Sequence, residues 1–361
     1  MYDKSLMNTK RNKVLITGGC GFIGSHTATL LLEKGFNLVI IDSNKNSNPK
    51  VIDRIFHLGI KDKRNSPNSI NFYKGDIRNY KFLNEVFEQE KKIGSEISFV
   101  IHFAGLKSVT ESTKIPLEYW DTNVSGTITL LKVMEIHDCK NIIFSSSATV
   151  YEKSKSSTIH ENNSKNPTNP YGKTKLTIEN ILRTVFDGSL KSWKIASLRY
   201  FNPIGAHPSG LLGEDPNGKP NNIFPLINNV ASGQKKFLEI YGKNWNTIDG
   251  TCIRDYVHVL DVALGHIHTM EYLKTSDPQF LIINIGTGKG TSVLELVKTF
   301  EYANNIKIPY KFSRRREGDL EKIVADNSFL KSLLKWTPSK DLEEMCRDGW
   351  KWKNLHPNGY K

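Results

Sequence analysis

An α/β fold, with a doubly wound parallel sheet and a smaller C-terminal α/β lobe, is the architecture that the sequence predicts from three observations. A short aliphatic run at residues 14–16 breaks into glycines and then into an apolar helical pattern. Similar runs recur through the first 200 residues, with helical patterns between them. The runs are almost continuously aliphatic, which is typical of strands in a parallel sheet that is covered on both faces.

The first of these runs leads into a glycine motif, Gly18-x-x-Gly21-x-x-Gly24. Glycine permits the tight turn from strand to helix and lets backbone N–H groups approach a pyrophosphate, which the helix N-terminus then faces. The next run, residues 36–41, ends at Asp42, close to the ~20-residue offset at which an acid binds a ribose hydroxyl. Because a carboxylate would repel the extra phosphate of NADP, the pattern predicts a Rossmann-like site for NAD. The alternative is that Asp42 only ends a strand.

Four further strand patterns follow, at residues 69–74, 99–103, 141–144 and 195–198. Small or polar residues come directly after each of them, for example Gly75-Asp76-Ile77 after the first. Ligands of parallel sheets bind at the carboxyl ends of the strands. We therefore expect these breaks to lie together on one rim of the sheet.

The region after Asn202 differs, because it is rich in Gly, Pro and Asn as far as Asn222. This composition predicts long loops, which in a compact protein are usually functional. A further strand is expected at residues 280–285, followed by a helix that starts at the capping-box pattern Ser292-x-x-Glu295.

The chain is expected to divide near residue 200. Residues 1–12 are polar and charged and lack the apolar core of a secretory signal, so they are expected to form a disordered leader. Residues 13–200 are expected to form the dinucleotide-binding domain, and residues 201–361 a substrate-binding lobe. Some later segments are expected to return to the first domain.

Composition narrows the possible functions. The chain has 361 residues, of which 38% are hydrophobic and 24% charged, and no run approaches the ~20 apolar residues of a membrane span. The four cysteines lie far apart, which favours a reduced cytoplasmic protein. The net charge of +13 is spread along the chain, whereas nucleic-acid binders concentrate charge on one stripe. The charge could attract an anionic substrate or reflect surface drift.

The pattern Tyr171-x-x-x-Lys175 is the sharpest candidate for catalysis. Pro170 suits a helix start, which would place Lys175 one turn after Tyr171 on the same face. A nearby ammonium and a cationic nicotinamide would lower the phenol pKa from ~10, so that Tyr171 could take a proton from a substrate hydroxyl while hydride leaves the same carbon. Ser147 could share that proton. Alternatively, Tyr171 is exposed, Lys175 is solvated, and the serines serve as turn or N-cap residues.

Together, these motifs resemble the extended short-chain dehydrogenases/reductases, and within them the enzymes that epimerise UDP-hexoses at C4. The likeness runs from Lys13 to the end of the sequence. Besides the glycine motif, it rests on segments 75–79, 101–107, 144–151, 170–173, 198–203, 205–210, 254–259 and 315–319.

The resemblance implies roles for individual residues. Tyr171 would be the base, Lys175 would hold the nicotinamide ribose, and Ser147 would bridge to the substrate. NAD would contact Gly18, Gly21, Phe22, Ile23, Gly24, Asp42, Asn44, Ser47, Asp76, Ile77, Phe103, Ala104, Gly105, Lys107, Thr122 and Phe201. The UDP-sugar would contact Asn202, Asn222, Glu239, Ile240, Tyr241, Arg254, Arg316, Asp319 and Ile323.

The resemblance also implies an activity, namely reversible interconversion of UDP-glucose and UDP-galactose by transient oxidation at C4 with tightly bound NAD, in a cytoplasmic homodimer. Another epimerase, acting on UDP-N-acetylglucosamine or UDP-glucuronate, stays open, because Ile323 is intermediate in bulk at the position that gates the sugar pocket. A dehydratase needs an Asp-Glu pair where this chain has Ala148-Thr149. A non-catalytic NAD-binding protein and a basic nucleic-acid-associated protein also stay open. His258, His266 and His268 cluster without a cysteine or carboxylate, so no metal is expected.

Overall fold

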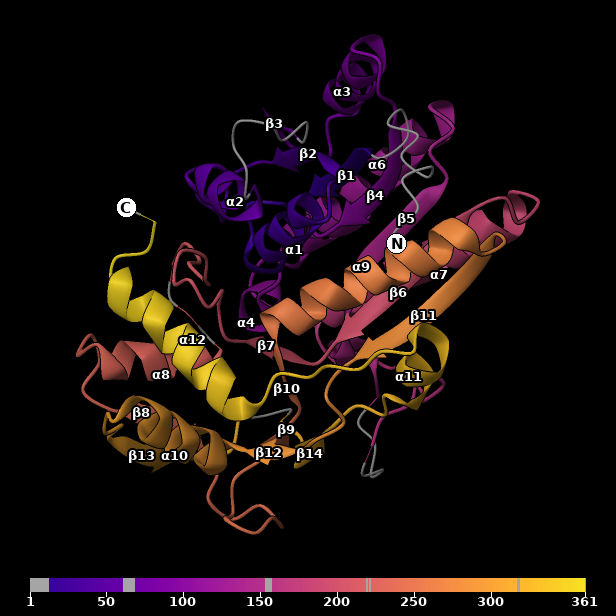
Figure 1. Cartoon of the computed structure of the whole chain (residues 1–361). Helices are drawn as coiled ribbons and strands as arrows, with labels where there is room; N and C mark the ends of the chain where they lie inside the picture. The colour runs from indigo at the N-terminus through magenta and orange to yellow at the C-terminus, as the bar shows by residue number, and fades with distance from the viewer. Residues whose placement is uncertain are drawn as a thin grey trace.

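A parallel sheet of seven strands is the largest unit in the described part of the computed structural model, which covers residues 13–60, 69–152, 158–218, 220, 222–316 and 319–360 (Figure 1). The expected leader, residues 1–12, lies outside the described residues. In spatial order the strands are β11 (Gln279–Ile285), β6 (Lys194–Tyr200), β5 (Asn141–Ser147), β4 (Ile97–His102), β1 (Lys13–Thr17), β2 (Asn37–Asp42) and β3 (Ile70–Lys74).

The strand order reverses direction between β1 and β4. From β1 the chain adds β2 and β3 on one side, and then it crosses over to add β4, β5 and β6 on the other. In such sheets ligands bind at this reversal, beyond the carboxyl ends of the strands. The predicted doubly wound α/β fold is therefore confirmed, and its topology locates the place where a site is expected.

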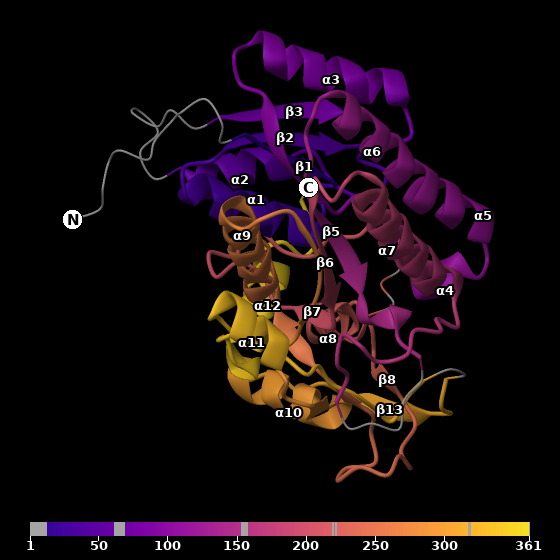
Figure 2. The same ribbon diagram turned by 90° about the vertical axis from the view of Figure 1, so that its right-hand side faces the viewer.

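Helices cover both faces of the sheet, as Figure 2 shows. One face carries α1 (Phe22–Glu33), α2 (Val51–Gly59) and α9 (Val259–Thr275); the other carries α3 (Tyr80–Lys92), α6 (Gly126–Ile136) and α7 (Pro170–Gly188). Between β4 and α6 the chain forms α4 (Val109–Ser112), α5 (Pro116–Tyr119) and the π-helical turn η3 (Trp120–Ser125).

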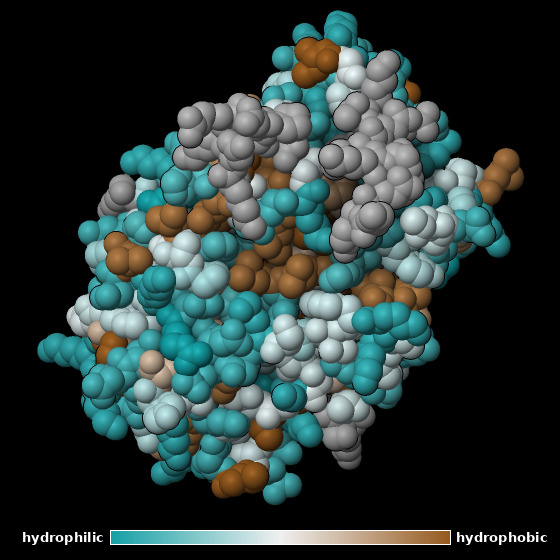
Figure 3. Space-filling view, in the orientation of Figure 1, coloured by the Kyte–Doolittle hydropathy of each residue, from teal (hydrophilic) through white to brown (hydrophobic). Residues whose placement is uncertain are grey.

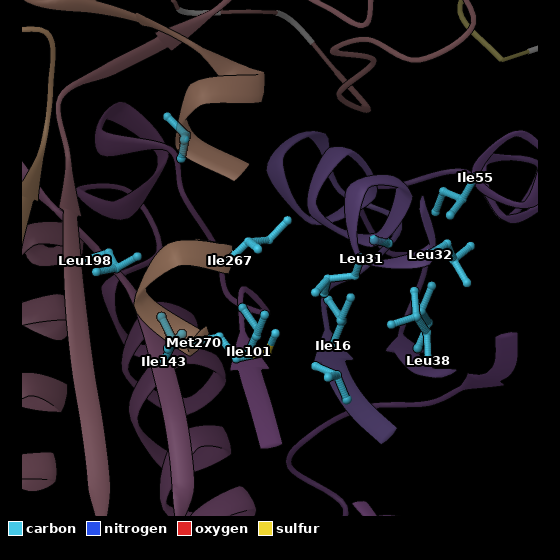
Figure 4. Packing of buried hydrophobic residues seen from close by; sticks show 14 of the residues in the cluster. Ile16, Leu31, Leu32, Leu38, Ile55, Ile101, Ile143, Leu198, Ile267 and Met270 are labelled. Atoms are coloured by element: carbon cyan, nitrogen blue, oxygen red, sulfur yellow. The ribbon is translucent and has the colours of Figure 1, made fainter. Parts of the chain in front are cut away.

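Alternation of side chains along the strands explains the two hydrophobic layers. In β1, Val14 and Ile16 belong to the layer under α1 and α9, whereas Leu15 belongs to the layer under α3, α6 and α7. Figure 4 shows Ile16 beside Leu31 of α1, with Ile267 of α9 in the same layer. Each fully buried aliphatic side chain contributes roughly 1.5–3 kcal/mol, so strands that are aliphatic throughout are explained by burial on both faces.

Most of the elements after residue 200 form a smaller second lobe with small sheets of its own. Its elements are β7 (Asn202–Ile204), α8 (Ile223–Ala231), β8 (Leu238–Tyr241), β9 (Ile253–Arg254), β10 (Tyr256–His258), β12 (Thr291–Ser292), α10 (Val293–Asn304), β13 (Tyr310–Ser313), β14 (Lys322–Ile323) and α12 (Leu342–Leu355). The predicted capping box is confirmed, since Ser292 and Glu295 make both of its hydrogen bonds. Three later elements belong to the large sheet instead: β11 joins it, α9 packs on it, and α11 (Ser328–Leu334) packs against both β11 and α9.

The surface seen in Figure 3 is mostly hydrophilic, with hydrophobic patches set into it. Among the described helices, none combines the length and apolar character that crossing a membrane would require. All four cysteines are buried free thiols.

Three buried histidines predict a fold that weakens in mild acid. Burial lowers the pKa of His26 and His102 to about 3 and that of His266 to about 4. The unfolded chain binds these protons near pH 6.5, so the native state is favoured above that pH and loses stability as the pH falls towards the folded pKa values.

We expect each such histidine to cost about 1.4 kcal/mol of unfolding free energy for every pH unit below 6.5. Denaturant unfolding across this range would measure the slope. Both ring nitrogens of His102 are hydrogen-bonded: Nδ1 lies 2.6 Å from Thr17 Oγ1, and Nε2 lies 2.9 Å from Thr127 Oγ1. The variant His102→Asn should show a shallower slope than the wild type, and an identical slope would contradict the assignment.

Candidate active site

A cavity of about 510 Å³ lies at the strand-order reversal. The large sheet contributes the glycine turn after β1 and the carboxyl ends of β2, β4 and β5, while α7 contributes its first turns. The second lobe closes the opposite side with Glu239–Tyr241, Arg254, Arg316 and Asp319. The cavity therefore lies where the topology places a ligand site.

The glycine turn leaves no room for side chains. Gly18 has φ +71°, and a Cβ there would lie 2.7 Å from the backbone nitrogen of Ala104. A Cβ on Gly24 would lie 2.5 Å from the carbonyl oxygen of Gly18. Gly21 caps α1 without any side-chain hydrogen bond, so the first N–H groups of the helix need an acceptor from elsewhere. A pyrophosphate fits this cradle.

Asp42 lies next to the cradle and organises the loop that follows β2. Its carboxylate accepts from the backbone N–H of Cys20 at 2.9 Å, from the N–H of Asn44 at 2.9 Å and from Ser47 Oγ at 2.8 Å. An ionised carboxylate has about four acceptor positions, so one stays available for a ribose hydroxyl. The chemistry of this wall suits NAD.

The adjoining carboxylate, Asp76, is held by Arg78. Arg78 Nη2 lies 2.6 Å from Asp76 Oδ2, and the hydrogen bonds from Arg78 lower the pKa of Asp76. A second contact joins Arg78 Nη1 to Asp121 Oδ2 at 2.6 Å. Asp76 is thus an ionised acceptor at the edge of the cavity.

Tyr171 and Lys175 lie on the first turns of α7, as the spacing predicts. Asn169 caps the helix, since its side chain accepts from the N–H of Gly172 at 2.8 Å. Lys175 is only 4% exposed, and its ammonium donates to the Ser145 carbonyl at 2.7 Å and lies 5.8 Å from the centre of the Tyr171 ring. Burial lowers the pKa of Lys175 to about 7, against an opposing effect of Glu179.

The pKa of Tyr171 moves in the direction opposite to the one expected. Burial raises it, and the hydrogen bond with Ser147 lowers it by less. The protein alone therefore keeps the phenol protonated, because the free-energy cost of removing a phenolate from water is larger than the stabilisation that one hydrogen bond gives. A positive charge close to the phenol oxygen would favour the phenolate. Ser147 also caps a short 3₁₀ turn (η4, Ala148–Val150) through the N–H of Thr149, so it has a structural role as well.

Two guanidinium groups converge on Asp319 in the second lobe. Arg316 Nε lies 3.0 Å from Asp319 Oδ2, and Arg254 Nη2 lies 3.8 Å from Asp319 Oδ1. Arg254 is fixed further by the carbonyls of Ile253 and Leu320. Two cations against one carboxylate leave a positive charge, and the forked donors suit a diphosphate.

Of the residues predicted to contact ligands, all but two line this cavity. Asn44 lies behind Asp42 and holds Ser47 through a 3.1 Å hydrogen bond. Ile323 pairs with Arg254 in the sheet, and its side chain packs beside a buried cluster that includes Phe201. Neither is among the residues that line the cavity.

The sequence patterns did not reveal the segment Gly213–Pro216 and Tyr360, which also line the cavity. The Tyr360 hydroxyl donates to the Gly213 carbonyl and accepts from the Gly213 N–H, both at 3.0 Å. The composition after Asn202 indicated a functional loop without selecting these residues. No local pattern marks Tyr360, because its partner is far away in the sequence.

Comparison with known proteins identifies the family. The family model described as GDP-mannose 4,6 dehydratase matches residues 15–349. The UDP-glucose 4-epimerase of Dictyostelium discoideum is 44% identical over 97% of this chain and 98% of its own length. The chain belongs to the UDP-glucose 4-epimerase family. The family member from Bacillus subtilis (strain 168) is also 44% identical, over 96% of this chain and 98% of its own length.

Solved structures of the UDP-glucose 4-epimerase family share the fold. The enzyme of Bifidobacterium longum, in complex with NAD+ and UDP, superimposes with a TM-score of 0.88 at 42% identity, covering 96% of this chain and 99% of that one. The enzyme of Stenotrophomonas maltophila, with NAD and formylated UDP-arabinopyranose, gives 0.89 at 40% identity, covering 96% and 98%.

Proposed function

We propose that this protein interconverts UDP-glucose and UDP-galactose by epimerisation at C4, with NAD as a resident cofactor. The observation that carries the proposal is that Tyr171, Lys175 and Ser147 share one cavity with a side-chain-free pyrophosphate cradle and a pair of arginines. This combination suits a reaction that needs a base, a dinucleotide and a diphosphate-linked substrate. Family membership at 44–46% identity supports the same activity.

Each residue then has a task. NAD, held in the glycine cradle, would supply the group that accepts a hydride from C4 of the hexose and donates one back. Tyr171 Oη takes the proton of the 4-hydroxyl and gives it back, while Ser147 Oγ holds the same oxygen. The Lys175 ammonium would favour the phenolate and would hold the nicotinamide ribose. For both roles Lys175 must stay protonated, although its burial lowers the pKa of its ammonium group.

The second lobe grips the nucleotide. Arg254 and Arg316 would hold the diphosphate, and Asp319 would accept from ribose hydroxyls. A 4-keto sugar must turn about its link to the diphosphate before it is reduced on its other face. Most of the binding energy should therefore come from UDP, so that the hexose stays free to turn.

The direct test is incubation of purified protein with UDP-galactose, without added NAD, and separately with UDP-N-acetylgalactosamine. Formation of UDP-glucose is expected from the first. No conversion by protein shown to carry NAD would refute the proposal. Conversion of both sugars would show that the site near Ile323 accepts an acetamido group.

Arg316 gives a separate test of the diphosphate site. We expect Arg316→Ala to raise KM for UDP-galactose roughly tenfold to 100-fold with kcat little changed, because a hydrogen bond to a charged group contributes about 1.5–3 kcal/mol. Steady-state kinetics would measure this. Arg314→Ala is the matched control, since Arg314 is exposed and does not line the cavity. Equal effects of the two substitutions would contradict the assignment.

A cytoplasmic homodimer is part of the proposal. Buried free thiols suit a reducing compartment. Leu117 on α5 is 82% exposed, and Val109 on α4 and Ile115 nearby are also exposed, which supports an apolar contact between copies. Sedimentation analysis would test it, and a monomer at all concentrations would oppose it.

A further inference from the structure

A buried ion pair between Glu179 and Arg199 lies directly behind the candidate catalytic residues. We propose that Glu179, held by Arg199, is a positioning residue that fixes Tyr171 and Lys175 on α7 against the serines at the end of β5. The inference rests on the proposed function, because it concerns the geometry of the same site. It adds a residue that is not expected to touch substrate or cofactor.

Glu179 continues the line of reactive side chains along α7. It follows Lys175 by one turn and Tyr171 by two, so all three lie on one face of the helix. Glu179 is 2% exposed. Its Oε1 accepts from Ser146 Oγ at 2.5 Å and from Arg199 Nε at 2.9 Å, and its Oε2 accepts from Arg199 Nη2 at 2.5 Å.

These contacts join three elements of the site at one carboxylate. Glu179 belongs to α7, Ser146 to β5 and Arg199 to β6. Ser146 lies between Ser145, whose carbonyl accepts from Lys175, and Ser147, whose side chain lowers the pKa of Tyr171. A slide of α7 along β5 would therefore break the contact between Glu179 and Ser146 together with the contact between Lys175 and Ser145.

Arg199 is anchored as firmly as its partner. It is 0% exposed, and its Nη1 donates to Tyr151 Oη at 2.9 Å and to the Glu161 carbonyl at 3.0 Å. Tyr151 Oη donates in turn to Asn284 Oδ1 on β11 at 2.6 Å. Buried ion pairs can often be replaced by apolar residues without loss of stability. A pair tied to four elements around one site is better explained by positioning than by stability.

Charge gives the pair a second effect. Within the described residues, Glu179 is the group that raises the pKa of Lys175, against the lowering by burial. Lys175 also lies near Tyr171 on α7 and His102 on β4. Burial lowers the pKa of His102 to about 3, so His102 is neutral. Tyr200 on β6 interacts with Tyr171, and burial raises the pKa of Tyr200, so Tyr200 is neutral as well. Arg199 on β6 is neutralised by Glu179 itself. Removing the Glu179 charge would leave Lys175 without the group that raises its pKa.

The test is Glu179→Gln, which keeps the size of the side chain and one acceptor for Ser146 but removes the charge. We expect kcat to fall about 100-fold, the effect of a misplacement of about 1 Å, while KM for UDP-galactose stays within about twofold. Lys175 should lose its proton at lower pH, so the phenolate is less favoured and the acid limb of the kcat profile should move to higher pH.

A spectroscopic measurement complements the kinetics. The ultraviolet absorbance of the Tyr171 phenolate, taken as a difference against protein carrying Tyr171→Phe, reports its ionisation without turnover. In Glu179→Gln the midpoint of this titration should rise. An unchanged midpoint together with an unchanged kcat would overturn the proposal.

Glu90→Gln is the matched control. Glu90 on α3 is also 0% exposed, is paired with Lys13 and accepts from Tyr73 Oη at 2.6 Å, but it does not line the cavity. Both substitutions should lower the melting temperature, and only Glu179→Gln should move the pH profile. If the pH profiles of kcat were the same for Glu179→Gln and Glu90→Gln, the role of Glu179 would be structural only. If the wild type itself fails to convert UDP-galactose, the proposed function fails instead.

Ser146→Ala covers the case in which Glu179→Gln does not fold. It removes one hydrogen bond to the carboxylate and leaves the ion pair intact. We expect a kcat lower by up to about tenfold, the equivalent of one hydrogen bond, with KM unchanged. A kcat equal to that of the wild type would overturn the positioning role.

Discussion

Turnover is expected to disappear when Tyr171 is replaced by Phe, while binding of UDP stays close to that of the wild type. The substitution removes one oxygen from the first turn of α7 and keeps the ring, so the cavity should retain its shape. Loss of a positioned base lowers kcat by about 10² to 10⁴-fold. Single-turnover kinetics and calorimetric titration with UDP would measure the two quantities separately.

The control for this experiment is Tyr302→Phe on α10. Tyr302 is largely exposed and does not line the cavity, so the same loss of a hydroxyl there should leave kcat unchanged. Full activity of Tyr171→Phe would exclude this phenol as the base. Loss of UDP binding together with turnover would mean that the substitution disturbs the second lobe instead.

Loss of the cofactor is expected from Gly18→Ala. The added methyl group would meet the backbone of Ala104 at 2.7 Å, and Gly18 already has a positive φ that other residues adopt at a cost. The backbone of the turn must shift, and the pyrophosphate cradle shifts with it. We expect the variant to purify without NAD and to lose at least about 100-fold in activity, measured by absorbance of released nucleotide and by epimerase assay.

The control Gly94→Ala separates the two effects of Gly18→Ala, namely backbone strain at a positive φ and the steric clash of the new Cβ. Gly94 has a similar φ of +87°, but nothing lies within 4 Å of the position of its Cβ. It ends α3, away from the cavity. This control should lose some thermal stability and keep both NAD and activity. Retention of NAD by Gly18→Ala would show that the turn can move without losing its ligand.

Much of the fold could be predicted because burial on both faces leaves a direct mark in the sequence. Strands such as β1 and β2 are aliphatic at consecutive positions. The start of the helix after Ser292 is marked by a capping-box pattern, in which the two residues that form the hydrogen bonds are three positions apart. These signals are local, so they need no knowledge of the tertiary structure. The same pattern predicts a doubly wound parallel sheet, but it does not give the order of the individual strands within that sheet.

The parts of the site that were missed depend on distant residues. The upward shift in the pKa of Tyr171 comes from burial, and burial at a helix start is set by everything packed around it. The spacing of Glu179, two turns after Tyr171 on the same helix, can be read from the sequence. Its partner Arg199 belongs to a separate strand, so the helical pattern alone does not predict the ion pair. Ile323 could be aligned with a family position, yet its side chain packs outside the cavity lining.

The bond between Tyr360 and Gly213 has a consequence for biosynthesis. When the first 200 residues have been synthesised, the glycine cradle and the phenol are already present, but one wall of the cavity depends in part on a tyrosine that is translated 147 positions after its partner. The same wall is held by Trp352, whose Nε1 donates to the Glu214 carbonyl at 3.3 Å. The nascent chain therefore spends most of the time needed to make the second lobe with an open nucleotide groove. Retention of the dinucleotide should therefore become strongest once α12 and Tyr360 have folded against this wall.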